Sequence, residues 1–181
     1  ADRQQFGKPI IEFPAVYDML ALMKAKLDAG RALLYQCSRY VDLYKALEDI
    51  GRERKLEADE GKEQKEYAKL ADSLTPLAKG INSEYANQNT YDSIQIHGGS
   101  GFMLDYPIQR FYRDARITSI YEGTTQLQVV AAIRYVTNGS YLKQMRDFEQ
   151  AEVSEALRPI QERARAMADT FADAVDHVKA M

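Results

Sequence analysis

The residues that could do chemistry in this sequence gather in two loops. One is residues 121–124, Tyr-Glu-Gly-Thr, where the Glu122 carboxylate stands beside a glycine just before an expected helix start. A loop carboxylate can accept a proton from a bound substrate if it lies within reach of that proton. Acidic residues are also common at helix starts, because they interact favourably with the helix dipole. Taken alone, Glu122 therefore has a structural as well as a catalytic interpretation.

The other loop, residues 95–102, is rich in glycine and reads Gln-Ile-His-Gly-Gly-Ser-Gly-Phe. Glycine lets another backbone or a flat ligand approach closely, and backbone N–H groups freed there could hydrogen-bond a cofactor. Taken alone, a glycine-rich helix end is the simpler interpretation. We expect His97, inside this loop, to be structural rather than catalytic.

Helices must position both loops, because strand signals are nearly absent. Apolar residues at three- and four-residue steps indicate helices. The pattern predicts them over about residues 14–49, 67–96, 107–117, 124–136, 141–151 and 153–180. The stripe of the first helix, expected to be buried, is Val16, Met19, Leu20, Met23, Leu27, Leu34, Cys37, Val41 and Tyr44.

Several residues suggest how these helices begin, end and pack. Gly30 falls in the first stripe, and close approach of a neighbouring helix would explain a glycine there. Thr75 could cap a new helix, or Pro76 could kink a continuous one. We expect Thr124 to be the N-cap of the helix that follows Glu122.

These elements predict an all-α fold, an up-down four-helix bundle with a C-terminal helical extension. The bundle is expected over residues 1–138 and the extension over 139–181. A charged run over about residues 50–66 interrupts the bundle pattern. It is too polar for a core, so it is either a solvated loop or an exposed helical extension.

Composition excludes several classes of protein. The chain of 181 residues is 45% hydrophobic, typical of a globular domain, and its net charge of −3 argues against nucleic acid as main partner. Cys37 is the single cysteine, so no internal disulfide forms. No apolar run could span a bilayer and no signal-peptide layout is present. We expect a cytoplasmic protein without a metal site, and a chain that begins within a longer protein because it lacks an initiator methionine.

The two loops and the helix between them resemble the signature of the acyl-CoA dehydrogenase family. That signature is Gln-x-x-Gly-Gly-x-Gly, then Tyr-Pro, Arg-Asp-Ala-Arg/Lys and Ile-Tyr-Glu-Gly-Thr, and residues 95–125 carry every element in order. Residues 3–8, Arg-Gln-Gln-Phe-Gly-Lys, resemble the motif that opens the C-terminal helical domain of that family. The charged run and the extension are loosely similar to longer bacterial members, including those acting on methylthiopropionyl-CoA.

The resemblance implies FAD-dependent α,β-desaturation of an acyl-CoA thioester. Glu122 is then the base that removes the α-proton of the substrate while the β-hydride passes to the flavin. A thioester α-proton is weakly acidic, so this base must lie close to it and be shielded from water. Tyr121 and Gly123 would line the substrate cavity. An electron-transfer flavoprotein or a similar acceptor would reoxidise the flavin.

The resemblance also implies which residues bind FAD: Arg3, Gln5, Phe6, Gln95, Gly98, Gly99, Thr124 and Gln126. Arg3 would pair with the pyrophosphate. Gln95, Gly98 and Gly99 would hold the adenosine-diphosphate portion of the FAD of a neighbouring subunit, which implies a homo-oligomer, a dimer or a tetramer. Its subunits are expected to pair through one helical face, Leu127, Val130, Ile133 and Val136.

Three alternatives stay open at this point. An acyl-CoA oxidase shares the base but is reoxidised by oxygen. A non-catalytic flavoprotein relative would bind DNA or a protein partner, and a bare helical interaction module would have no chemistry.

Many relatives carry a glutamine where this chain has Pro14. Arg113, Asp114 and Arg116 are expected to form an ion-pair network, and Arg134 could contact CoA or a helix end.

Overall fold

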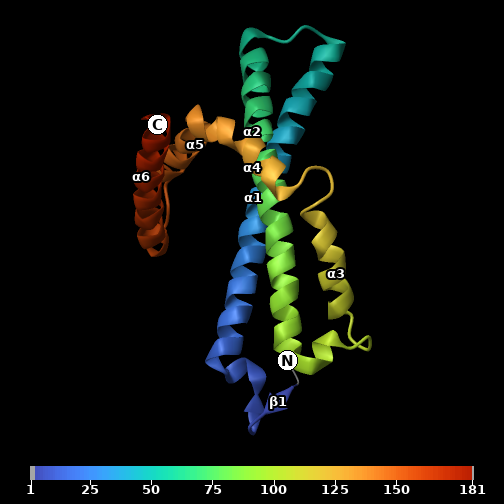
Figure 1. The fold of residues 1–181 in the computed structure, drawn as a ribbon. Helices are drawn as coiled ribbons and strands as arrows, with labels where there is room; N and C mark the ends of the chain where they lie inside the picture. The colour runs from blue at the N-terminus through green and yellow to red at the C-terminus, as the bar shows by residue number, and fades with distance from the viewer. Residues whose placement is uncertain (1–2, 181) are drawn as a thin grey trace. The chain divides into compact units, whose positions relative to one another are not determined.

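The computed structural model describes residues 3–180, which are mainly helical (Figure 1). The helices are α1 (Pro14–Glu53), α2 (Ala58–His97), α3 (Ile108–Thr118), α4 (Thr125–Thr137), α5 (Ser140–Glu149) and α6 (Arg158–Ala180). Short 3-10 turns cover Ile10–Glu12, Gly98–Phe102 and Glu155–Leu157, and two-residue strands β1 (Gln4–Gln5) and β2 (Lys8–Pro9) form a hairpin. The predicted all-α class is confirmed. The six helices follow the six predicted ones in order, and α2 begins earlier than predicted, at Ala58.

The chain divides into two compact units, and the division lies between Gln128 and Val129. The first unit contains the N-terminal hairpin, α1, α2, α3 and the start of α4. The second contains the rest of α4 with α5 and α6. Both loops that carry the predicted chemistry lie in the first unit.

Helices α1 and α2 pack antiparallel along most of their length (Figure 1). Side-chain hydrogen bonds join them at three levels, Asn89 to the carbonyl of Met23, Asn82 to that of Gly30 and Cys37 to that of Ala71. The partner numbers fall along α2 as they rise along α1, which fixes the antiparallel direction. Helix α3 packs against the C-terminal half of α2, again antiparallel: Asn87 donates to the carbonyl of Ala115, and the Tyr91 and Tyr112 rings are 6.3 Å apart.

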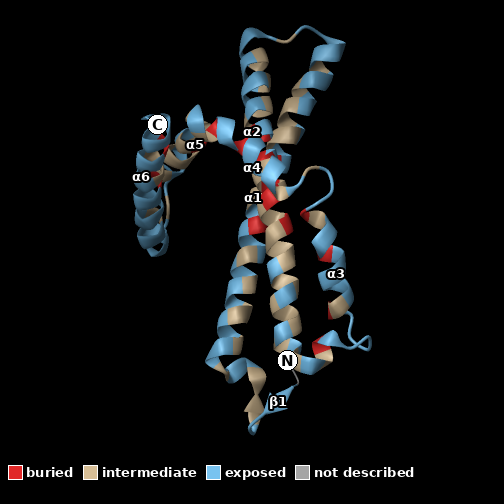
Figure 2. Ribbon diagram, viewed as in Figure 1, coloured by how far each residue is buried: buried red, intermediate tan, exposed pale blue. Residues whose placement is uncertain are grey.

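The buried core of the first unit lies between α1 and α2 (Figure 2). Cys37, Leu74 and Ala78 are buried, and Leu33, Tyr40 and Leu77 pack against them. Most of the predicted stripe of α1 is buried or half-buried. The prediction is wrong for two members, because Leu27 and Leu34 are 44% and 47% exposed. Both lie beside the line of contact with α2 rather than on it.

Among the described glycines of α1 and α2, Gly30 has the closest neighbour on the other helix. A Cβ at this position would lie 2.1 Å from Oδ1 of Asn82, so a side chain here would have to displace the Asn82 amide. The same Asn82 donates its Nδ2 to the Gly30 carbonyl at 3.3 Å. The predicted reason for this glycine, a neighbouring helix in close approach, is confirmed.

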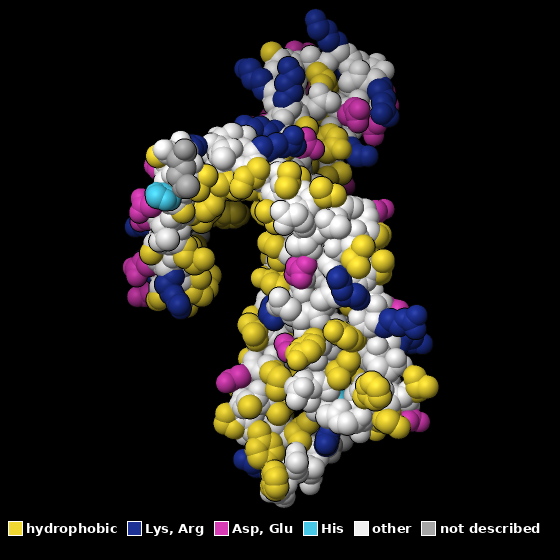
Figure 3. All heavy atoms as spheres, viewed as in Figure 1, with side chains coloured by type: hydrophobic (Ala, Val, Ile, Leu, Met, Phe, Trp, Pro, Cys, Tyr) yellow, Lys and Arg dark blue, Asp and Glu magenta, His cyan; other side chains and the backbone are white. Residues whose placement is uncertain are grey.

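The charged run forms the helical end of the α1–α2 hairpin, so the second of the two predicted alternatives holds. Only residues 54–57 are non-helical. Figure 3 shows basic and acidic side chains gathered over this end. Arg54 contacts both carboxylate oxygens of Glu60, at 2.7 and 2.6 Å. With the backbone N–H of Glu57 also donating to it, this contact lowers the pKa of Glu60 to about 2.

Pro76 lies inside α2, so residues 75 and 76 do not start a new helix. The Thr75 hydroxyl donates back to the Ala71 carbonyl at 2.8 Å, in the manner of a residue within a helix rather than an N-cap. Neighbouring helical bonds therefore keep α2 continuous through a position that lacks an N–H donor.

In the second unit, polar side chains join α5 to α6 and to the segment between them. Arg146 contacts Glu149 at 2.8 Å and Asp169 at 2.6 Å. Gln161 donates to the carbonyls of Glu149 and Ala151. No helix in the described part of the chain is long and apolar enough to cross a membrane.

Candidate active site

The loop that carries Glu122, residues 119–124, connects α3 to α4 and is closed by backbone hydrogen bonds. The N–H of Thr125 donates to the Ser119 carbonyl at 3.2 Å, across the base of the loop. The N–H of Tyr121 donates to the Ile117 carbonyl at 3.0 Å, which continues the last turn of α3. The loop, called the Glu122 loop below, therefore has a defined conformation.

Glu122 and Gly123 both adopt left-handed backbone conformations, with φ of 50° and 92°. That conformation costs a non-glycine residue about 1–2 kcal/mol. A Cβ on Gly123 would lie 2.8 Å from Nε2 of Gln128, so any larger residue must displace that amide as well as adopt the left-handed conformation. The Glu122 side chain is exposed and accessible to a ligand.

Two side chains bind the carbonyl groups of the Glu122 loop. Nζ of Lys79, on α2, donates to the Gly123 carbonyl at 2.6 Å. Nε2 of Gln128 lies 3.3 Å from the same oxygen and 3.4 Å from the Glu122 carbonyl. Nζ of Lys79 also lies 5.8 Å from the centre of the Tyr121 ring. These contacts compensate for the unfavourable backbone conformation.

Lys79 was not predicted from the sequence as a site residue. Its acceptor is a backbone carbonyl 44 positions away, and no side-chain pattern reveals such an acceptor. Only the structure shows that Lys79 is a half-buried cation between the buried residues Ala78 and Gly80.

The start of α4 is anchored separately from the Glu122 loop. The Thr124 hydroxyl accepts the N–H of Leu127 at 3.3 Å, which confirms Thr124 as the N-cap. The Thr125 hydroxyl donates to the Glu84 carboxylate on α2. The first turn of α4 is therefore attached to the middle of α2.

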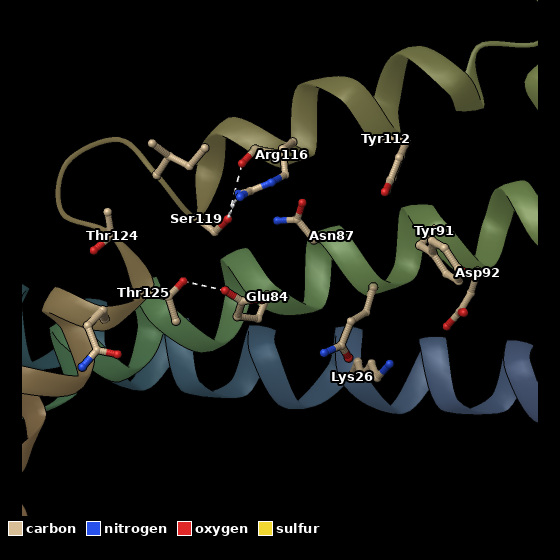
Figure 4. Close-up of a pocket in the computed structure, with 13 residues that line it drawn as sticks. Lys26, Glu84, Asn87, Tyr91, Asp92, Tyr112, Arg116, Ser119, Thr124 and Thr125 are labelled. Atoms are coloured by element: carbon tan, nitrogen blue, oxygen red, sulfur yellow. Dashed lines mark hydrogen bonds between the residues drawn. The ribbon is translucent and has the colours of Figure 1, made fainter.

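A groove of about 710 Å³ runs between α2 and α3 and reaches the start of α4 (Figure 4). Two of the predicted FAD contacts, Thr124 and Gln126, line it, whereas Glu122 does not. Its other lining residues are Lys26, Glu84, Asn87, Gln88, Tyr91, Asp92, Tyr112, Arg116, Ser119, Ile120 and Thr125. Because both basic and acidic side chains line it, the groove is polar without one dominant charge.

Arg116 lines this groove instead of forming the predicted ion-pair network. Its guanidinium donates to the Ser119 hydroxyl at 2.7 Å and points toward Asn87 (Figure 4). Within residues 3–180, no ion pair joins Arg113, Asp114 and Arg116, so that prediction is wrong. All three side chains are exposed, and the guanidinium of Arg116 uses the Ser119 hydroxyl as its partner instead.

The other predicted FAD contacts lie at the C-terminal end of α2. The Arg3 guanidinium donates to the His97 carbonyl, and a Cβ on Gly98 would lie 3.0 Å from its Nη1. Gly98 is left-handed, with φ of 61°, and ends α2. Gln95 and Gly99 are exposed beside it.

Gln5 and Phe6 lie on the N-terminal hairpin that follows Arg3. Phe6 is 87% exposed and, with φ of 51°, forms the turn together with Gly7. Its ring packs edge-on against Phe13 at 6.2 Å. Such an exposed aromatic face suits a flat ligand.

The predicted site residues thus form two groups rather than one cluster. Helix α3 separates them along the chain, and its 11 residues extend about 16 Å at 1.5 Å per residue. One group is the Glu122 loop with the start of α4. The other is Arg3, the hairpin and the end of α2.

Two further residues have local partners. Nδ1 of His97 lies 2.7 Å from the Ser93 carbonyl, and its ring lies 6.0 Å from the Tyr106 ring, so it stabilises the end of α2. In the second unit, the Arg134 guanidinium lies 4.5 Å from the Tyr135 ring centre and donates to the Tyr135 hydroxyl.

Comparison with known proteins identifies the family to which this fold and these loops belong. Residues 1–136 match the family model described as the C-terminal domain of acyl-CoA dehydrogenase, and residues 137–181 match a second model, acyl-CoA dehydrogenase C terminal. The chain belongs to the acyl-CoA dehydrogenase family.

Among curated relatives, 3-methylmercaptopropionyl-CoA dehydrogenase of Ruegeria pomeroyi is 39% identical over 126 residues, 68% of this chain and 19% of that protein. Cyclohexane-1-carbonyl-CoA dehydrogenase of Syntrophus aciditrophicus is 33% identical over 135 residues, 75% of this chain and 29% of that protein. The chain therefore spans less than a third of the length of either relative.

Solved structures give the same result. An acyl-CoA dehydrogenase from Bacillus anthracis, complexed with FAD, is 29% identical with a TM-score of 0.60 and covers 88% of this chain and 28% of its own. Butyryl-CoA dehydrogenase from Megasphaera elsdenii is 30% identical with a TM-score of 0.54 and covers 78% of this chain and 29% of its own.

Proposed function

We propose that this chain is the part of an FAD-dependent acyl-CoA dehydrogenase that supplies the base for α,β-desaturation of an acyl-CoA thioester. The observation that carries the proposal is the Glu122 loop. A single exposed carboxylate stands on a left-handed backbone, and a lysine and a glutamine bind the adjoining carbonyls. Holding one carboxylate in a fixed place serves proton abstraction better than it serves folding.

In this proposal each residue of the loop has one task. A carboxylate oxygen of Glu122 accepts the α-proton, and Tyr121 and Gly123 line the substrate cavity beside it. Bound FAD supplies the acceptor for the β-hydride. The chain itself orients the base and limits its movement, so that the carboxylate need not reorganise when the substrate arrives.

The residues assigned to FAD fit a dinucleotide. Arg3 offers a guanidinium beside Gly98, suited to a pyrophosphate. No atom lies within 4 Å of the Cβ position at Gly99, so a ligand can approach that backbone directly. Gln5, Phe6 and Gln95 complete this group, and Thr124 and Gln126 belong to the other. FAD in the Bacillus anthracis relative supports the assignment.

The separation of the two groups supports a homo-oligomer, in which the Gln95–Gly99 region of one subunit contacts the FAD of another. An electron-transfer flavoprotein is the proposed acceptor. A 34% identical relative from Acetobacterium woodii, a subunit of a caffeyl-CoA reductase–Etf complex, supports it. We further propose that residues 139–181 form an extension distinct from the bundle of residues 1–138. A cytoplasmic location stays a prediction.

The test is Glu122→Gln in the full-length protein. The amide is nearly isosteric but cannot take up the proton. We expect FAD content and acyl-CoA binding to be retained while turnover with an artificial electron acceptor falls by about three orders of magnitude or more. Glu152→Gln, at an exposed glutamate far along the chain, is the matched control and should leave turnover unchanged.

Two results would contradict the proposal. Turnover of the Glu122→Gln protein within about threefold of the parent would show that the base lies elsewhere. Oxygen consumption equal to turnover without any added acceptor would favour the oxidase alternative instead.

A further inference from the structure

We infer that Lys79 is a positioning residue for the proposed base: its ammonium group holds the Glu122 loop in the conformation that presents the carboxylate. The inference rests on the proposed function of Glu122. It concerns a residue on a different helix, distant in sequence and outside every motif of the two loops.

Lys79 contacts the loop directly through its ammonium group. Nζ of Lys79 donates to the Gly123 carbonyl at 2.6 Å, the shorter of the two contacts that this oxygen accepts. No carboxylate within residues 3–180 forms an ion pair with Lys79, so its charge is directed to the loop. A hydrogen bond from a charged donor is stronger than one between neutral groups.

The position of Lys79 limits what it can do. It is half-buried, with the buried residues Ala78 and Gly80 on either side along α2. Nζ also lies 5.8 Å from the centre of the Tyr121 ring, and Tyr121 and Gly123 are the residues before and after Glu122 in the sequence. Lys79 thus contacts the two neighbours of the base and fixes the peptide units that carry it.

The start of α4 has its own anchors, so loss of Lys79 affects the loop selectively. Thr124 caps α4 and Thr125 binds Glu84, and neither contact involves Lys79. Without the lysine, the Gly123 carbonyl keeps only Gln128, at 3.3 Å. The loop then relaxes toward less strained backbone angles, and the carboxylate moves away from the substrate α-carbon.

The experiment compares Lys79→Met, Lys79→Gln and Lys79→Arg in the full-length FAD-bound enzyme. A misplacement of about 1 Å lowers a rate by about 100-fold, so we expect Lys79→Met and Lys79→Gln to lower kcat about 10- to 100-fold. FAD content should stay within about twofold, because none of the residues assigned to FAD contacts Lys79, and KM should change less than kcat, because the loss falls mainly on the position of the base. Lys79→Arg should recover most of the activity, since its guanidinium can still donate to the carbonyl.

Lys69→Met is the matched control, at an exposed lysine on the same helix, and should leave kcat unchanged. Single-turnover flavin reduction should slow to the same extent as kcat, which places the loss in the proton-abstraction step. If Lys79→Met fails to retain FAD, Lys79→Gln, which is polar, neutral and one atom shorter than lysine, provides the comparison with Lys79→Arg.

The outcomes separate this inference from the proposed function. A parental kcat in Lys79→Gln, with Glu122→Gln inactive, overturns the positioning role and leaves the base assigned. An equal loss in Lys79→Arg and Lys79→Gln also overturns it, because the donated hydrogen bond then does not matter. An active Glu122→Gln protein overturns the proposed function itself.

Discussion

Glu122 and Gly123 are neighbours in the sequence, and both adopt a left-handed backbone conformation with positive φ. Glycine adopts it without strain, whereas glutamate must be held there. Phe6, in the turn of the N-terminal hairpin, is the one other described non-glycine residue with positive φ. Both non-glycine residues with this conformation therefore belong to the proposed functional groups, as expected where strain is kept for function.

A prediction at this scale concerns Gly123→Ala. The left-handed backbone costs alanine about 1–2 kcal/mol, and displacement of the Gln128 amide should cost about 1 kcal/mol more. Gly7→Ala has a similar φ of 76° with no atom within 4 Å of the added Cβ, so it measures the backbone cost alone. Denaturant unfolding of this chain should show a larger loss for Gly123→Ala, and equal losses would mean that the Gln128 contact contributes nothing.

The sequence predicted the Glu122 loop and the N-cap at Thr124 because both depend on local residue types. It did not predict Lys79, Gln128 or the groove contact of Arg116. The Lys79 contact depends on which helices lie side by side. Gln128 and Arg116 have partners within six residues, but the acceptors of Gln128 are backbone carbonyls and that of Arg116 is a hydroxyl in the loop. The periodicity of a single helix contains no information of that kind.

The α1–α2 hairpin shows the same limit at the scale of elements. Three residues at intervals of seven along α1 meet α2, namely Met23, Gly30 and Cys37. Leu33 and Tyr40, three residues after Gly30 and Cys37, pack the core instead of the predicted Leu34. A two-helix contact buries a narrow seam, so apolar residues beside it stay exposed even though their spacing indicates a buried face.

The close approach at Gly30 means that Gly30→Ala should have two opposing effects on stability. Gly30→Ala should gain up to about 1 kcal/mol in helix propensity. It should lose more than that, because overpacking costs about 1–3 kcal/mol and Asn82 must give up its bond to the Gly30 carbonyl. We expect a net destabilisation of about 1–2 kcal/mol by denaturant unfolding.

Gly61→Ala is the matched control on the exposed end of α2. No atom lies within 4 Å of its Cβ position, so this change should stabilise the chain by about 0.5–1 kcal/mol. The double variant Gly30→Ala with Asn82→Ala should recover much of the loss. Stabilisation by Gly30→Ala alone would show that Asn82 moves away freely and that the close contact is not tight.

At the scale of the whole molecule, the exposed apolar side chains of α4 need a partner. Leu127, Val130 and Ile133 recur at three-residue steps and are 58%, 56% and 50% exposed. Exposed apolar rows of this kind are a liability in a monomer. A second copy of the chain is the proposed partner, because the proposed FAD site also draws on a second subunit.

We therefore predict that the chain is at least a dimer. Light scattering at micromolar concentration should give a mass of at least twice the 20.6 kDa of one chain. Val130→Glu should reduce it to one chain with helicity unchanged, because a charge in an apolar interface is costly. Ala131→Glu, exposed on the same helix but off the row, should not. A parental protein of 20.6 kDa would refute the interface, and unfolding by Val130→Glu would show that this face is core.

The division of the functional residues between the two ends of α3 has a consequence for inheritance. If one subunit completes the cofactor site of another, a chain damaged at Glu122 still carries an intact Gly98, and the reverse also holds. When two such alleles are expressed together, a mixed dimer concentrates both lesions in one catalytic centre and leaves the other centre whole. Alleles that are each null on their own should then complement one another, whereas two alleles damaged in the same group should not.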